Sequence, residues 1–151
     1  MKQFSLALKK NAQRPIVFLE QLSSMEVMLD TGALFPIWFS CEDSLKAIGG
    51  VPVKRSVTFG GFGGTATGTI YRLPVFRFGS LIFPDFPVIA SSCALPCQML
   101  LSATMFRGLI YEVDDCNYRL NVSIPEKESE IRNLKIENRN GKLHVLCTNG
   151  K

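Results

Sequence analysis

The sequence predicts an all-β domain. Most segments alternate apolar with polar or small residues or form brief apolar runs, and Gly, Pro, Asn and Asp separate them at short intervals. A helical pattern occurs in a single short segment. The chain has 151 residues, of which 46% are hydrophobic and 20% charged. This composition suits one globular domain with an apolar core and excludes two full-size domains.

The N-terminal segments are expected to form three strands. The first strand is expected over 4–8, where apolar and small or polar residues alternate. The apolar runs 15–19 and 25–29 follow, separated by the polar segment 21–24. Because that segment is polar enough to turn the chain, we expect the two runs to pair as a hairpin.

The helical segment is expected over 41–48. Ser40 precedes it and can cap its first turn, which also carries acidic residues. Gly49 and Gly50 follow and are expected to end it. The helix is therefore short.

A long hairpin with a glycine-rich tip is expected next. Its two β-like arms are 53–59 and 67–75, and four of the first five residues of its tip are glycines. Glycine adopts positive φ angles at no steric cost, as a tight and mobile tip demands. The tip comprises Gly60, Gly61, Phe62, Gly63, Gly64 and Thr65.

The rest of the chain is expected to hold more strands and a C-terminal hairpin. Past Pro125, the segment 126–132 is charged and suits a linker or a short helix, and 133–147 suits a hairpin that turns at Asn140-Gly141. We therefore expect a domain at 1–125, with the charged segment and hairpin at 126–151 packed on it or on an interface between two copies. The further strands are expected over 75–78, 81–83, 88–90, 99–101, 109–113 and 118–124.

Charge and histidine content exclude several function classes. The 17 Lys and Arg exceed the 13 Asp and Glu by four, but they are scattered from Lys2 to Lys151. A nucleic-acid partner is therefore not expected, because its phosphates would require a basic stripe. A single histidine, His144, argues against His-based metal sites and against Ser-His or Cys-His catalysis.

Cysteine usage and hydropathy favour a cytoplasmic protein without a membrane partner. The five cysteines are odd in number and lack a disulfide spacing, and the first ten residues are too polar for a signal peptide. Cys93 and Cys97 would need two more ligands to hold a metal, so we expect buried or loop thiols and no metal. The uncharged span 86–106 is interrupted by prolines and polar residues, so it suits buried strands better than a membrane helix.

The segment Asp30-Thr31-Gly32-Ala33 is the sharpest local feature. It directly follows the apolar run 27–29. One interpretation is a turn that closes a strand, in which the aspartate accepts backbone hydrogen bonds. The other is a catalytic carboxylate held rigidly at the end of a buried strand, where a glycine lets the backbone pass close by. The surroundings favour the second interpretation.

This segment resembles the catalytic loop of the retropepsin-type, single-lobe aspartic proteases. The glycine-rich tip lies about where the flap of that family lies, and the segment 100–106 resembles its later apolar segment behind the active site. The resemblance spans 14–124. It implies a closed β-barrel-like lobe with a flap hairpin and one or two short helices, aspartic endopeptidase activity and no cofactor. The loop behind the active site would comprise Leu101, Ser102, Ala103 and Thr104.

Three positions depart from the family pattern. Ser102 stands where the family usually has glycine, which is expected to reshape the loop behind the catalytic strand. Many viral members carry an acid after the catalytic loop and an arginine after that glycine, and these positions hold Leu34 and Ala103 here. Both partners are absent together, so no unpaired buried charge results. These departures weaken the inference that this chain shares the substrate preference of the viral members.

The resemblance also implies a homodimer. In aspartic proteases two carboxylates about 3 Å apart share one proton, so that one activates a water and the other donates to the scissile carbonyl. This chain has one such motif, so the second Asp30 is expected from another copy across a two-fold axis. Thr31 would lock the two loops together, Gly32 would leave room for the substrate backbone, and the flap would close over an extended, apolar peptide.

Two other classes of function are retained at this point. The chain could be a catalytically weak or inactive dimerisation or peptide-binding module of the same fold, or a structural β-barrel with a chance motif. The remaining acids are poorer candidates for a catalytic site than Asp30. Asp114 and Asp115 suit a turn, Asp85 lies in a proline-rich loop, and Trp38 is expected in the core or in a subsite wall.

Overall fold

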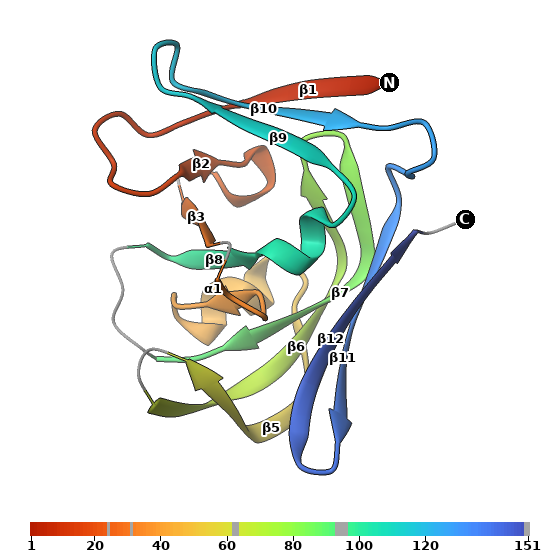
Figure 1. Ribbon diagram of the computed structural model, residues 1–151. Coiled ribbons are helices and arrows are strands. Elements are labelled where there is room, and N and C mark those ends of the chain that lie inside the picture. The colour runs from red at the N-terminus through yellow and green to blue at the C-terminus, as the bar shows by residue number, and fades with distance from the viewer. Residues whose placement is uncertain (24, 31, 62–63, 93–96, 150–151) are drawn as a thin grey trace.

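The all-β prediction is confirmed by the computed structural model of the chain (Figure 1). The structure describes residues 1–151 except 24, 31, 62–63, 93–96 and 150–151. Its one α-helix is α1 (Glu42–Ala47), and two short 3-10 helices are η1 (Glu20–Leu22) and η2 (Ala103–Phe106), all counted within the described residues. The strands are β1 (Lys2–Ala7), β2 (Ile16–Phe18), β3 (Glu26–Asp30), β4 (Ile37–Trp38), β5 (Val51–Gly61), β6 (Gly64–Phe78), β7 (Leu81–Ala90), β8 (Met99–Ser102), β9 (Ile110–Asp114), β10 (Arg119–Ile124), β11 (Arg132–Arg139) and β12 (Lys142–Asn149).

A seven-stranded sheet forms the centre of the molecule, in the order β2-β3-β8-β4-β7-β6-β5. The predicted hairpin of β2 and β3 is confirmed, with Ile16 opposite Met28 in antiparallel register. β3 then pairs in parallel with β8, although about seventy residues separate them in the sequence, and β4 pairs antiparallel with β8. This arrangement buries both β3 and β8 between neighbours.

The predicted glycine-rich hairpin is the pair β5–β6. Its strands are longer than expected, because β6 continues to Phe78 and pairs with β7 over most of its length. β7 is one strand where the sequence predicted two, and Asp85 adopts a φ of 52° between the two predicted halves. Pairing with β6 therefore overrides the two prolines that suggested a break in β7.

The helix α1 is shorter than predicted, and its predicted cap is wrong. Cys41, not Ser40, occupies the N-cap position in extended conformation, and no side chain caps the helix. The hydroxyl of Ser44 instead donates to the carbonyl of Cys41 at 2.7 Å. The predicted end is confirmed, because Gly49 has a φ of 101° and its N–H donates to the Lys46 carbonyl.

A three-stranded sheet, β1-β10-β9, crosses the molecule beside the central sheet (Figure 1). Its inward face contributes Leu120 and Val122 to the main core. Its outward face is mostly polar, with a side-chain hydrogen bond from Ser5 to Asn121, and also carries the exposed Ile110. β1 and β9 are the edge strands of this sheet.

The predicted C-terminal hairpin is confirmed as β11–β12, and it turns at Asn140 and Gly141 with positive φ angles of 54° and 79°. It packs along β7 through the buried Leu134. Its first residue, Arg132, is 2% exposed and pairs with Glu128 at 3.2 Å, while its other amino group donates to the carbonyl of Arg107. This buried arginine joins the hairpin to the segment that follows η2. The preceding charged segment forms turns, not a helix.

The closed barrel implied by the resemblance is not formed. The central sheet runs from β2 to β5, and no ladder joins these two edges within the described residues. The three-stranded sheet and the C-terminal hairpin cover the apolar face of the central sheet. Residues from all three form one hydrophobic core. Because the apolar surface is buried in this way, closure is not needed. Among the described residues, no helix is long and apolar enough to cross a membrane.

Candidate active site

Asp30 is the last residue of β3, and the buried residues Val27, Met28 and Leu29 precede it. In the parallel register of β3 and β8, Asp30 lies beside Ser102, the last residue of β8. The two segments that the sequence singled out therefore end side by side. Buried strands on both sides of β3 fix the position of the Asp30 backbone.

The carboxylate of Asp30 is oriented by the loop that follows it. The N–H of Gly32 donates to Oδ1 at 2.9 Å, and the N–H of Ala33 donates to the Asp30 carbonyl at 3.1 Å. A Cβ atom at position 32 would lie 3.4 Å from Oδ1. The backbone at Gly32 therefore passes close to the carboxylate, and the role of glycine at this position stays a prediction.

Arg14 approaches the same carboxylate from the other side. Its Nη1 atom lies 3.6 Å from Oδ2 of Asp30, and the two side chains are 63% and 22% exposed. The contact follows from the hairpin register, since the N–H of Leu29 donates to the carbonyl of Pro15 and the next pair outward is Arg14 and Asp30. The carboxylate is therefore accessible and lies beside a cation, although the pair is too exposed to add much stability.

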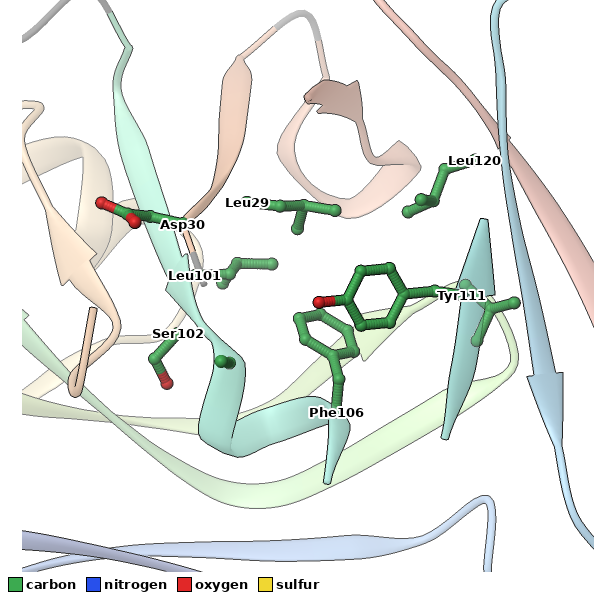
Figure 2. A pocket seen from close by; sticks show the side chains of 9 residues that line it. Leu29, Asp30, Leu101, Ser102, Phe106, Tyr111 and Leu120 are labelled. Carbon is green, nitrogen blue, oxygen red and sulfur yellow. The ribbon is translucent and has the colours of Figure 1, made fainter. Parts of the chain in front are cut away.

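A small apolar pocket lies behind Asp30. Its volume is about 10 Å³, which is room for about one water molecule and not for a substrate. Figure 2 shows the carboxylate of Asp30 turned away from the apolar side chains of this pocket. No second carboxylate is among the described residues that line it. The lining residues are Leu29, Asp30, Leu101, Ser102, Ala103, Phe106, Tyr111, Leu120 and Val122.

Ser102 is fully buried beside Asp30, and its hydroxyl has no hydrogen-bond partner among the described residues. A buried polar group without a partner costs about 1–3 kcal/mol. Ser102 is therefore an energetic cost to the isolated chain. The expectation that it reshapes the loop stays a prediction.

The loop after Asp30 contacts the stem of the glycine-rich hairpin. Phe35 and Phe59 pack edge-to-face with ring centroids 6.2 Å apart, and both are buried. Ala33 and Ala66 pack against the same apolar cluster. The stem is also anchored on its other side, where Tyr71 donates to Glu42 on α1. The hairpin and the Asp30 loop therefore share one packed unit.

The predicted site residues are only partly joined by the structure. Asp30, Leu101, Ser102 and Ala103 share one pocket, and Thr104 follows in η2. Gly60 and Gly61 end β5, and Gly64 and Thr65 begin β6. Thr31, Phe62 and Gly63 lie outside the described residues.

The other candidate residues have structural roles. Asp114 accepts the N–H groups of Cys116 and Asn117, as expected of a turn. The side-chain amide of Asn117 also donates to it at 2.8 Å, and this bond, together with the weaker effect of the backbone bonds, lowers the pKa of its carboxyl. Asp85 pairs with Arg72 on the surface.

Trp38 is fully buried in the core. Within the described residues, no cluster of three potential metal ligands exists; Cys93 lies outside them. Burial raises the pKa of the Cys97 thiol.

Comparison with known proteins gives a likeness of fold. No protein-family model matches the chain, and no curated protein matches it. The structure is similar to the crystal structure of a retropepsin-like aspartic protease from Rickettsia conorii, with a TM-score of 0.51. The match covers 97% of this chain and 94% of that chain. The two sequences are 14% identical. The fold is retropepsin-like.

Three features of the site around Asp30 were not predicted from the sequence. Arg14 could have been found by extending the expected hairpin register to the end of β3. The contact between Phe35 and Phe59 joins segments whose pairing the sequence does not indicate. Tyr111 reaches the pocket from β9, on a separate sheet, so no local pattern could reveal it.

Proposed function

We propose that this protein is a homodimeric aspartic endopeptidase that hydrolyses peptide bonds in extended, apolar segments. The observation that carries the proposal is the placement of Asp30. Its carboxylate is partly exposed, fixed by the Gly32 N–H, and held at the end of a strand flanked by β2 and β8. A rigid, accessible carboxylate at this place in a retropepsin-like fold supports a role in catalysis.

The chemistry requires a second Asp30 from another copy. Two such carboxylates close together share a proton, because two like charges at that distance cannot both ionise. The ionised one accepts a proton from a bound water, and this water attacks the scissile carbonyl. The protonated one donates to the carbonyl oxygen. One protomer therefore holds half of the machinery.

The exposed edge of strand β9 supports self-association of the chain. Ile110, Tyr111 and Val113 are 57%, 39% and 37% exposed, so apolar side chains emerge on an unpaired strand edge. Such an edge readily pairs with another chain. β9 also lies against the pocket behind Asp30, because Tyr111 lines it.

The glycine-rich hairpin would act as the flap. Its stem is tied to the Asp30 loop by Phe35 and Phe59, so a movement of one element is transmitted to the other. An extended peptide between them would add as a strand and be recognised mainly through its backbone. Thr31 keeps its expected role in locking the two loops together, and the flap that includes Phe62 keeps its expected role in closing over the peptide, both as proposals.

The proposal is tested with Asp30→Asn. We expect the purified variant to cleave a peptide library at least about a hundredfold more slowly than the unaltered protein, while its sedimentation coefficient stays unchanged. Asp43→Asn, which alters an exposed carboxylate on α1, should cleave normally. Full activity of Asp30→Asn would disprove the dyad. A dimer that binds peptides but cleaves none would favour the peptide-binding module instead.

A further inference from the structure

A second groove, separate from the Asp30 site, opens between β1 and the segment that follows β2. Its volume is about 850 Å³, and it shares no lining residue with the pocket behind Asp30. One wall is formed by 5–7 and Arg119, and the other by 18–21, Arg77 and Gly79. The groove is large enough for several residues of an extended chain.

The walls of this groove are held in place by hydrogen bonds. The side chain of Gln21 donates to the Val75 carbonyl and accepts from the Arg77 N–H, both at 2.8 Å. At one end, Leu8 on the β1 side bridges to Val17 in β2. The groove is therefore a wedge between two sheet edges that is closed where they converge.

The β1 wall carries backbone groups that point into open space. The N–H of Leu8 donates to the Tyr118 carbonyl at 2.9 Å, and Leu6 aligns with Leu120 in the same antiparallel ladder. Because backbone groups alternate along a strand, Leu6 and Leu8 face β10 and Ser5 turns its N–H and C=O to the free edge. An extended peptide could pair with this edge.

The charges beside this edge favour an acidic occupant. Arg77 and Arg119 are exposed, and neither forms an ion pair within the described part of the chain. Glu20 is the one acidic side chain in the described lining. Phe18, at 36% exposed, adds an apolar contact surface on the opposite wall.

We propose that this groove binds an extended acidic peptide segment of a partner protein. The segment would add to β1 as a further strand, with carboxylates paired to Arg77 and Arg119 and an apolar side chain against Phe18. Backbone pairing would supply affinity and the two arginines would supply the preference for acids. Peptide binding in this groove needs no hydrolysis, so the proposal does not depend on the proposed protease activity.

Fluorescence anisotropy with labelled octapeptides tests the proposal. To prevent any cleavage of the probe, Asp30→Asn is used beside the unaltered protein. A peptide of alternating Glu and Val should bind saturably and lose affinity as salt is added, because its charge pairs are exposed. The matching Lys-Val peptide should not bind. A Glu-Val peptide that is N-methylated at alternate residues should lose at least about tenfold in affinity, because it cannot donate to the strand edge.

Protein variants identify the groove as the binding site. The double variant Arg77→Gln/Arg119→Gln should bind the Glu-Val peptide with an affinity at least about tenfold lower than that of the unaltered protein. Arg139→Gln, on the distant C-terminal hairpin, should bind it normally. Equal binding by the double variant, or by the N-methylated peptide, would overturn the proposal, as would equal binding of the Lys-Val peptide. Should the double variant misfold by circular dichroism, the N-methylated peptide on unaltered protein still decides.

Discussion

Phe35 and Phe59 pack edge-to-face, with their ring planes at 74° and their centroids 6.2 Å apart. Phe35 belongs to the loop after Asp30, and Phe59 to the stem of the glycine-rich hairpin. Edge-to-face pairs add about 0.5–1.5 kcal/mol beyond burial of their area. The candidate catalytic loop and the candidate flap are therefore in direct contact at their bases.

Phe59→Ala is expected to lower the free energy of unfolding by about 3–5 kcal/mol, because Phe59 is 4% exposed in a packed cluster. In the folded fraction, KM for a peptide substrate should rise more than kcat falls. Urea unfolding and steady-state kinetics measure these changes. Phe18→Ala, at a 36% exposed position, is the control and should cost far less. Similar losses in both variants would contradict a role for this contact.

Ser102→Ala is expected to stabilise the protein. The change removes a buried hydroxyl that has no partner among the described residues, so the free energy of unfolding should rise by about 1 kcal/mol. Ser91→Ala provides the contrast, because its buried hydroxyl donates to the Thr67 carbonyl at 3.2 Å. That variant should lose about 0.5–1.5 kcal/mol in urea unfolding. A destabilised Ser102→Ala would indicate a partner for this hydroxyl in solution.

Arg132→Ala is expected to cost about 3–5 kcal/mol, because it leaves Glu128 without its partner in a buried site. Arg139→Ala breaks the exposed pair with Glu137 and should cost less than about 1 kcal/mol. Both values follow from chemical denaturation. Replacing Arg132 and Glu128 together by Met and Leu should recover much of the loss. Equal effects of the two single variants would refute a structural role for the buried pair.

Val113→Lys is expected to weaken self-association, since it places a charge on the apolar edge of β9. Sedimentation equilibrium should show a dissociation constant raised by at least about tenfold. Leu146→Lys makes the same change at a similarly exposed position, 38%, on the C-terminal hairpin. It should associate normally. If Leu146→Lys weakens association and Val113→Lys does not, the interface lies on the C-terminal hairpin and not on β9.

The thiol of Cys147 is expected to make the free energy of unfolding depend on pH in the alkaline range. Burial raises the pKa of its thiol above the ordinary value of 9.0. The unfolded thiol therefore ionises first, so this contribution is complete below pH 9.0 and is lost as pH rises through the folded pKa. Unfolding free energies measured from about pH 8 to about pH 10.5 should fall less steeply in Cys147→Ala. The exposed Cys116→Ala should retain the original slope.

Hairpins and turns were predictable from the sequence because their signals are local. Asn140-Gly141 favours the positive φ angles that its turn adopts, and the polar turn between β2 and β3 separates two apolar runs. The position of Asp30 at the end of a buried strand followed from the same pattern. The predicted cap at Ser40 was wrong because the helix begins one residue later than expected, so that Cys41 occupies the N-cap position without a side-chain cap.

Contacts between distant segments required the three-dimensional fold. The parallel pairing of β3 with β8 puts Ser102 beside Asp30, and the packing of the hairpin buries Arg132. Periodicity marks which face of a strand is apolar but does not specify the neighbouring strand. An all-β chain and a candidate carboxylate can thus be recognised from residue order, whereas the surroundings of that carboxylate depend on long-range pairing that no local pattern encodes.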